Sequence, residues 1–233
     1  MGNLIDQIRK DLRYEEALHA CMNCGMCTAV CPAAEFYDYD PRRICDLVQR
    51  NDEATIEKLL RSETIWYCGQ CMSCKPRCPR GNAPGEIINV LRKVSQETGY
   101  FRENKMGQQQ TGLMNGIVKN ILEIGYCVHP DRVDPNKHVE QGPVWRWYVD
   151  NIEDIAPKLG ANYHGEGAGA LRTIPHEDMT EVHKIFEVTG GFDLREKVIV
   201  YRVLFVNPIY SVFAGSYQRD RQKRQETGHM EEI

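Results

Sequence analysis

The chain has 233 residues, which is the size of one or two small domains. Its formal net charge of −4 shows no basic excess, so we do not expect nucleic acid to be its partner. The first residues, Met1 to Asp6, lack the basic stretch and apolar core of a secretion signal. Asp6 also does not fit the myristoylation pattern, so we expect neither export nor a lipid anchor.

The segment ahead of residue 21 predicts a helix, because apolar residues recur at helical spacing. These residues are Leu4, Ile5, Ile8 and Leu12. A cysteine run follows this segment, and the same run recurs further along the chain. The two runs are Cys21-x2-Cys24-x2-Cys27-x3-Cys31-Pro32 and Cys68-x2-Cys71-x2-Cys74-x3-Cys78-Pro79. Eight of the ten cysteines lie in them, so these runs dominate the chemistry of the chain.

This spacing is the bacterial ferredoxin run, in which three close thiolates hold one [4Fe–4S] cluster and the fourth ligates the other cluster. The proline after the fourth cysteine turns the chain away. The sequence therefore predicts two [4Fe–4S] clusters with crossed ligation. The first would be held by Cys21, Cys24, Cys27 and Cys78, and the second by Cys68, Cys71, Cys74 and Cys31.

Structural zinc is the alternative metal, but it uses two Cys-x2-Cys pairs that are usually a dozen or more residues apart. Four cysteines so close together, ending in Cys-Pro, fit that arrangement less well. A disulfide framework is another alternative, but it is typical of short secreted chains, and the first residues here do not resemble a signal peptide. Because cluster cysteines must stay reduced until assembly, we expect the protein to be cytoplasmic.

Three more helices are predicted around the second run. Asp40-Pro41 starts one, with an N-cap acid and proline at the first helical position. A second lies around Ile56–Leu60, and a third runs from Pro84 to near Gly99. The alternating strand patterns of a βαββαβ ferredoxin are absent from the sequence. We therefore expect a mainly α protein, with an α-helical ferredoxin domain over residues 1–103.

Residues 104–233 are expected to form a C-terminal mixed α/β extension that docks onto partners. Gly107 to Gly112 predicts a polar linker at its start, and Pro175 to Val188 predicts a helix. No further cluster cysteine run occurs after the linker. The extension is therefore not predicted to add another cluster of this type.

The longest apolar stretch, Val198 to Gly215, is too short and too interrupted for a membrane span, which needs about 20 mostly apolar residues. It predicts a strand pair turning at Asn207-Pro208 or a partner-docking segment. From about Ser216 the chain is a charged tail with both signs in balance.

With these motifs the chain resembles the iron–sulfur C-subunit family of the heterodisulfide reductases over roughly residues 1–103. The resemblance rests on both cysteine runs, the helical spacer and the Pro84 helix. It implies an electron-transfer subunit with two [4Fe–4S] clusters, placed between a flavin- and cluster-rich subunit and a catalytic, cysteine-rich subunit. The Cys-Cys pair that marks the catalytic subunit does not occur here, so no substrate-converting site is expected in this chain.

Other helical ferredoxins share the double run, including the iron–sulfur subunits of glycolate oxidase and glycerol-3-phosphate dehydrogenase. An iron–sulfur redox sensor is an alternative function of a different class. The extension after residue 103 is long for the methanogen members of the C-subunit family. Together with Tyr163 to Gly167, it is more similar to the heterodisulfide-reductase-like complexes of sulfur-oxidising microbes.

Four further features are expected to be structural. Cys45 beside an apolar stripe is interpreted as a small buried hydrophobe, and Cys127 near His129 is too weak a pair to predict a metal site. Gly165-x-Gly167-x-Gly169 lacks the preceding strand of a dinucleotide fingerprint. The tryptophans on either side of Arg146 are expected in the core, with an interface anchor as the alternative. They are Trp145 and Trp147.

The two runs differ in charge. The first has no charged residue between Cys21 and Cys31, whereas the second contains Lys75 and Arg77 and is followed by Arg80. A nearby cation stabilises the reduced form of a cluster. We therefore expect the cluster of the second run to have the higher reduction potential.

Overall fold

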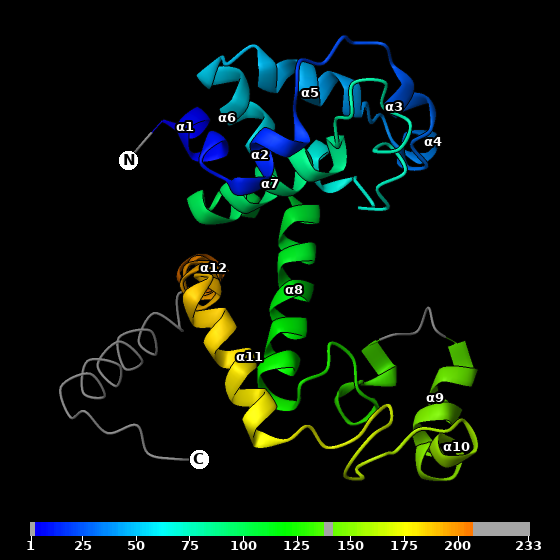
Figure 1. The fold of residues 1–233 in the computed structure, drawn as a ribbon. Coiled ribbons are helices and arrows are strands. Elements are labelled where there is room, and N and C mark those ends of the chain that lie inside the picture. The colour runs from blue at the N-terminus through cyan, green and yellow to red at the C-terminus, as the bar shows by residue number, and fades with distance from the viewer. Residues whose placement is uncertain (1–2, 138–141, 207–233) are drawn as a thin grey trace, which may run out of the picture. The chain divides into compact units, whose positions relative to one another are not determined.

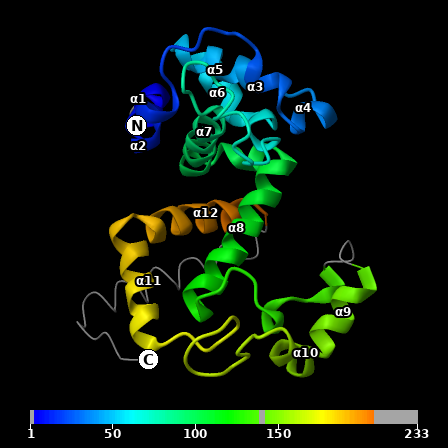
Figure 2. The ribbon, with the colours of Figure 1, turned by 45° about the vertical axis from the view of Figure 1, so that its right-hand side comes forward.

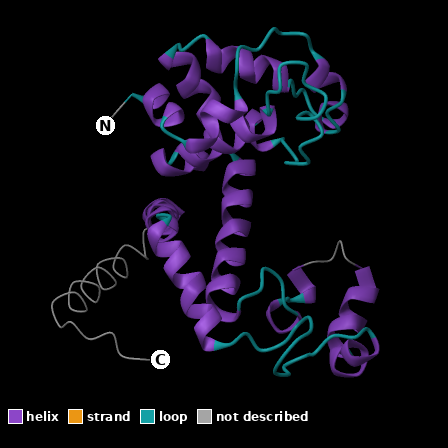
Figure 3. Ribbon diagram, viewed as in Figure 1, coloured by secondary structure: helices purple, strands orange, loops and turns teal. Residues whose placement is uncertain are grey.

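A computed structural model describes residues 3–137 and 142–206 of the chain. Within those ranges the protein consists of helices and loops, and no strand occurs (Figures 1 and 3). The mainly helical class predicted from the sequence is confirmed. The described residues divide into two compact units, one formed by residues 3–111 together with residues 194–206, and one formed by the described residues between 112 and 193.

The first unit is built around α7 (Pro84–Thr98), against which α1, α2, α5 and α6 pack (Figure 2). Its core is the apolar face of α7, where Ile87, Val90 and Leu91 have no exposed surface. The other elements before α7 are α1 (Leu4–Arg9), α2 (Leu12–Ala17), α3 (Met26–Ala29), α4 (Ala33–Phe36), α5 (Pro41–Gln49), α6 (Glu53–Arg61) and η1 (Thr64–Trp66). The short η2 (Tyr100–Glu103) follows α7.

The predicted start and stop signals of these helices are confirmed. Asp40 caps α5 by accepting a hydrogen bond from the Arg43 backbone N–H at 3.1 Å, with Pro41 as the first helical residue. Gly99 ends α7 in the left-handed conformation, with φ of 82°, which glycine adopts at little cost. Local signals thus determine where the helices begin and end.

The segment before the first cysteine forms two short helices instead of the single helix that its periodicity predicts. Asp11 caps α2 by accepting from the Arg13 backbone N–H at 3.1 Å, and this cap separates α2 from α1. Leu12 consequently points outward and is 94% exposed. The prediction that Leu12 belongs to the apolar stripe is wrong.

The predicted polar linker from Gly107 to Gly112 is also wrong, because these residues lie within α8 (Lys105–Ile124). The side chain of Asn104 accepts a hydrogen bond from the Gly107 backbone N–H at 2.7 Å, as an N-cap does. A Cβ at Gly107 would come within 3.0 Å of Trp66, so the glycine permits close packing. Close packing against Trp66 therefore explains why a glycine occurs at position 107, where the sequence suggests a linker.

The second unit contains the end of α8 and the helices of the extension. These are η3 (Pro130–Arg132), η4 (Pro135–Lys137), α9 (Gly142–Asp150), α10 (Ile152–Lys158) and α11 (His176–Val188). The helix predicted from Pro175 to Val188 is confirmed as α11. On α9 no residue is buried, and Trp147 is 59% exposed, so the prediction of a core position is wrong for Trp147.

The final described element is α12 (Gly191–Val206), and it corrects the strand prediction for Val198 to Val206. Valine and isoleucine favour strands, but this preference depends strongly on context. The described part of the extension is helical, so its expected α/β character is not confirmed. The turn predicted at Asn207-Pro208 and the charged tail from about Ser216 lie outside the described residues. No helix in the described ranges combines the length and apolarity that a membrane crossing requires.

The glycine-rich loop of the second unit is closed over Asn162. The Asn162 amide donates hydrogen bonds to the carbonyl oxygens of Glu166, at 2.7 Å, and Ala168, at 3.1 Å. A Cβ at Gly165 or Gly169 would collide with the Asn162 side chain. Packing on Asn162 therefore accounts for these two glycines.

Candidate iron–sulfur site

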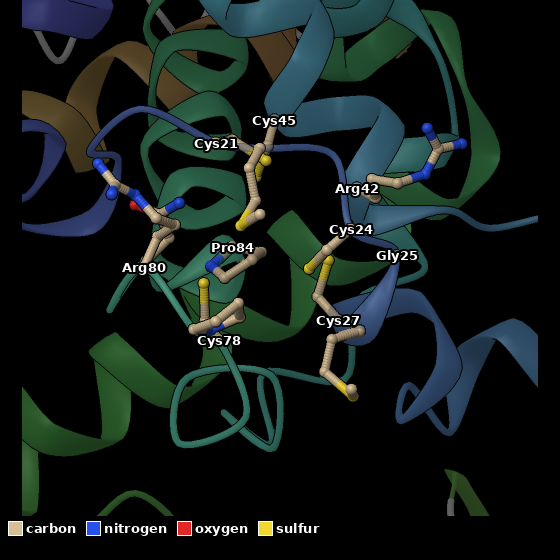
Figure 4. A pocket seen from close by; sticks show the side chains of 13 residues that line it. Cys21, Cys24, Gly25, Cys27, Arg42, Cys45, Cys78, Arg80 and Pro84 are labelled. Carbon is tan, nitrogen blue, oxygen red and sulfur yellow. The ribbon is translucent and has the colours of Figure 1, made fainter.

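The eight cysteines of the two runs lie around two pockets of the first unit, four at each, and no cysteine of the chain is in a disulfide. Cys21, Cys24, Cys27 and Cys78 line the first pocket (Figure 4). Cys31, Cys68, Cys71 and Cys74 line the second pocket. The structure thus brings together the members of each expected ligand set, including the exchanged fourth cysteine. Ligation itself stays a prediction.

The two runs share an unusual backbone conformation at matched positions. Asn23 and Gln70, each two residues after the first cysteine of its run, have φ of 56° and 54°. Gly25 and Met72, each following the second cysteine, have φ of 82° and 57°. Non-glycine residues seldom adopt positive φ. Its recurrence indicates that both runs follow the same sharply turned path around their pockets.

Helix α5 holds the first run in place. Gln49 bonds the backbone of Cys21 in both directions, accepting from its N–H at 2.6 Å and donating to its carbonyl oxygen at 3.3 Å. The hydroxyl of Thr28 donates to the carboxylate of Asp40 at 2.5 Å. These contacts fix both ends of the Cys21–Cys27 segment against one helix.

Helix α7 holds the second run. Arg92 donates a hydrogen bond to the Cys68 carbonyl oxygen at 2.7 Å. The Gln70 side chain donates to Asn89 at 2.5 Å. A Cβ at Gly85 would lie 3.0 Å from the sulfur of Met72 and 3.7 Å from that of Cys74, so this glycine lets the run lie close to the helix.

The charges around the pockets differ from those predicted by the runs. Arg80 lines the first pocket together with Arg42 from α5, although it follows the second run in sequence. Figure 4 shows both guanidinium groups pointing away from the centre of the pocket. Lys75 and Arg77 are exposed and line neither described pocket, and no charged residue lines the second. The expectation that Arg80 lies at the second cluster is therefore wrong.

Burial sets the protonation of several thiols. Burial raises the pKa of Cys27 to about 11 and also raises the pKa of Cys74. Hydrogen bonds from Ser73 lower the pKa of Cys71. Metal ligation requires thiolates, so a cluster bound at either pocket would require these thiols to lose their protons, including that of the buried Cys27.

A ninth cysteine reaches the first pocket. Cys45, on α5, is 1% exposed and lies among the lining residues, and burial raises its pKa. Its position as a small buried hydrophobe agrees with the prediction from its apolar neighbours. Sequence spacing carried no signal that it would contact a cluster pocket, because the contact depends on how α5 packs.

The tenth cysteine, Cys127, is exposed and belongs to the second unit. His129 is buried there, and its ring stacks on that of Tyr163 with 5.9 Å between the ring centres. Its Nδ1 lies 3.5 Å from a carboxylate oxygen of Asp131. In the described ranges, no three His, Cys, Asp or Glu side chains are arranged to hold a single metal ion.

The thiol sets fit an iron–sulfur centre, and comparison with known proteins agrees. A family described as a 4Fe-4S dicluster domain matches residues 13–82, which include all eight run cysteines. The C subunit of the ferredoxin:CoB-CoM heterodisulfide reductase of Methanosarcina acetivorans is 35% identical over 208 residues, covering 86% of this chain and 74% of that protein. The chain belongs to the heterodisulfide reductase C-subunit family.

Other members of the C-subunit family are also similar. The C subunit of the ferredoxin:CoB-CoM heterodisulfide reductase of Methanosarcina mazei is 29% identical over 123 residues, covering 53% of this chain and 68% of that protein. The iron–sulfur C subunit of the CoB--CoM heterodisulfide reductase of Methanopyrus kandleri is 29% identical over 144 residues, covering 59% of this chain and 73% of that protein. As a member of this family with a 4Fe-4S domain, the chain is an iron–sulfur electron-transfer subunit.

Coverage of 86% of the chain extends well beyond residue 103. The length of the extension therefore does not separate this chain from the Methanosarcina acetivorans protein.

Proposed function

We propose that the chain carries two [4Fe–4S] clusters and relays electrons through them within a heterodisulfide-reductase-like complex. The observation that supports this most strongly is the division of the run cysteines, four to each of two pockets. The first cluster would be held by Cys21, Cys24, Cys27 and Cys78, and the second by Cys68, Cys71, Cys74 and Cys31. When bound, such clusters supply one-electron transfer.

The residues of the chain itself would ligate the clusters, exclude water and present the pockets to partners. Cys27 at the first pocket is buried, and so is Ile88, which lines the second pocket. Each pocket also has two exposed large hydrophobic side chains among its lining residues, Met22 and Met26 at the first and Phe36 and Tyr37 at the second. Exposed apolar groups at two pockets favour two docking surfaces, as a relay between two partner subunits requires.

The partners proposed on this basis are a flavin- and cluster-rich subunit and a second subunit with the catalytic cysteine-rich cluster. The ferredoxin domain would comprise residues 1–103, and residues 104–233 would serve docking. We place the complex in the cytoplasm. The sulfur-oxidation subtype stays a prediction that now rests on Tyr163 to Gly167 alone, because the length of the extension no longer supports it.

Anaerobic purification of the full chain tests the cluster content. We expect about eight irons and about eight acid-labile sulfides per chain, as two cubanes require. Bound zinc without sulfide would overturn the proposal. Native purification should also recover flavin-containing and cysteine-rich partner subunits. Recovery with a glycolate or glycerol-3-phosphate dehydrogenase would favour that alternative.

A second measurement separates an electron relay from a redox sensor. Repeated one-electron reduction and reoxidation should leave the iron and sulfide content unchanged if the chain is a relay. Loss of a cluster during the first cycles would favour a sensor.

A further inference from the structure

Arg92 is a buried cation with no ionic partner in the part of the chain that the structure describes. Its residue surface is 7% exposed, and its guanidinium donates hydrogen bonds to the carbonyl oxygens of Ile65, at 2.8 Å, and Cys68, at 2.7 Å. It also lies over the ring of Trp66, 5.4 Å from the ring centre. A buried charge is costly unless an opposite charge compensates it. The position of Arg92 therefore calls for an anion near Cys68.

Tyr39 is a second buried polar group at the same place. It is 3% exposed and lines the second pocket, and in the described ranges its hydroxyl makes no hydrogen bond of ordinary geometry, although the Cys68 thiol is within interacting range. A phenol hydroxyl is protonated at neutral pH, so it can donate a hydrogen bond. Buried hydroxyls nearly always find an acceptor. An acceptor is therefore expected in the second pocket.

The two groups converge on the same cysteine. Arg92 donates to the carbonyl oxygen of Cys68 at 2.7 Å, and Tyr39 lines the pocket that Cys68 also lines. Cys31, the exchanged cysteine, lines this pocket as well. The hydrogen bond to the Cys68 carbonyl would by itself explain Arg92 as a structural brace, but it does not explain why a buried hydroxyl donor lines the pocket of the same cysteine.

We propose that Arg92 supplies the buried counter-charge, and Tyr39 the sulfur hydrogen bond, for the cluster held by Cys31, Cys68, Cys71 and Cys74, and that together they raise its reduction potential. The inference rests on the proposed function. A cluster bound by four thiolates gains one negative charge on reduction. A fixed cation and a hydrogen bond to sulfur stabilise that form more than the oxidised form.

The order of reduction follows from this difference in burial. The cations at the first pocket are poorly placed to act, because Arg80 is exposed and Arg42 is bound to the Asp40 carboxylate at 2.8 Å. Exposed and paired charges are strongly screened. The second cluster is therefore reduced first. This is the order predicted from the runs, but it depends on Arg92 and Tyr39 instead of Lys75 and Arg77.

A redox titration followed by electron paramagnetic resonance tests the proposal on the full chain. One electron enters per cluster, from dithionite, and no cysteine ligand is exchanged. The signal of the second cluster is identified as the one that Cys31→Ser perturbs. Arg92→Gln should reduce its reduction equilibrium constant at least tenfold, which is about 59 mV for a one-electron couple. Arg92→Lys should restore part of this shift, and Tyr39→Phe should give a smaller shift of the same sign.

Two matched variants serve as controls. Lys93→Gln removes the neighbouring cation, which is ion-paired with Asp11 at 3.3 Å. Tyr67→Phe removes a hydroxyl at the same pocket that instead bonds Glu63 at 3.2 Å. Both should leave the midpoint of the second cluster unchanged.

An unchanged midpoint in Arg92→Gln with full iron content would overturn the proposal. If Arg92→Gln does not assemble the second cluster, the midpoint of Tyr39→Phe tests the proposal instead, because this variant keeps the ring and removes only the hydroxyl. An unchanged midpoint there would also overturn it. If the wild-type protein lacks a second cluster, the proposed function itself is refuted. If the wild-type protein has two clusters and the variants leave the midpoint unchanged, only the proposal about Arg92 and Tyr39 is refuted.

Discussion

The side-chain oxygen of Asn82 accepts a hydrogen bond of 2.7 Å from the backbone N–H of His19. Asn82 is buried, and the next residue, Ala83, donates its own N–H to the Ala17 carbonyl oxygen at 2.8 Å. His19 lies just before the first cysteine run and Asn82 just after the second. This pair of contacts therefore fastens the end of one run to the beginning of the other, which places Cys78 at the first pocket.

Replacing Asn82 should disrupt the first cluster before the second. Asn82→Ala removes the acceptor of the partly buried His19 N–H, and the loss of this hydrogen bond costs about 1 kcal/mol. We expect the purified variant to lose iron from the Cys21/Cys24/Cys27/Cys78 set, measured by iron content and paramagnetic resonance. Asn120→Ala, which removes an exposed hydrogen bond to the Cys127 carbonyl, should leave both clusters intact. Equal loss of both clusters would show that Asn82 stabilises the whole unit.

The crossed ligation can be tested with a reciprocal pair of variants. Cys31→Ser should perturb the cluster of Cys68, Cys71 and Cys74, because Cys31 lies at their pocket. Cys78→Ser should perturb the cluster of the first run instead. Each variant should leave the other signal largely unchanged in electron paramagnetic resonance. Perturbation of the cluster of its own run in each case would contradict the crossing.

Cys45 lies at the first pocket but should not be a ligand. Its burial raises the pKa of the thiol, and the four other cysteines there already complete a cubane. Cys45→Ala should therefore keep full iron and sulfide content. Deleting its buried sulfur should lower the unfolding free energy by about 1 kcal/mol, measured by urea titration. Iron loss comparable to that of Cys78→Ser would make Cys45 a ligand.

The ion pair at Asp11 gives a prediction about pH. The Arg13 guanidinium beside Asp11, at 2.8 Å, holds the pKa of that carboxyl well below its usual range, and Lys93 adds a contact at 3.3 Å. A carboxylate with a lowered folded pKa stabilises the fold above its unfolded pKa of about 3.9, and this contribution is lost only as the pH falls below that value.

Asp11→Asn keeps a good helix cap but removes the charge. Because Arg13 and Lys93 are partly exposed, the loss should be only about 1 kcal/mol. The deficit should be the same at about pH 6 and about pH 8, since both lie above the unfolded pKa. Urea unfolding at the two pH values measures this deficit in unfolding free energy, and substitution of the exposed Asp38, Asp38→Asn, is the control. A deficit that changes between them would contradict the assignment to Asp11.

What the sequence determined by itself was local. The spacing of each cysteine run depends on neighbours within about ten residues. Asp40, Pro41 and Gly99 act within one helical turn, so the start of α5 and the end of α7 followed from residue type alone. The C-subunit family could be inferred for the same reason, because its motifs are short and contiguous.

Only the tertiary structure decided which side chains meet across the fold. Arg80 follows the second run yet lines the first pocket, and Cys45 reaches that pocket from α5. Leu12 has the right periodicity for a buried stripe but is exposed, because the Asp11 cap starts a new helix. Burial makes Arg92 the influential cation, and burial depends on how α7 packs against segments far away in the sequence. Spacing along the chain carries no information about such contacts.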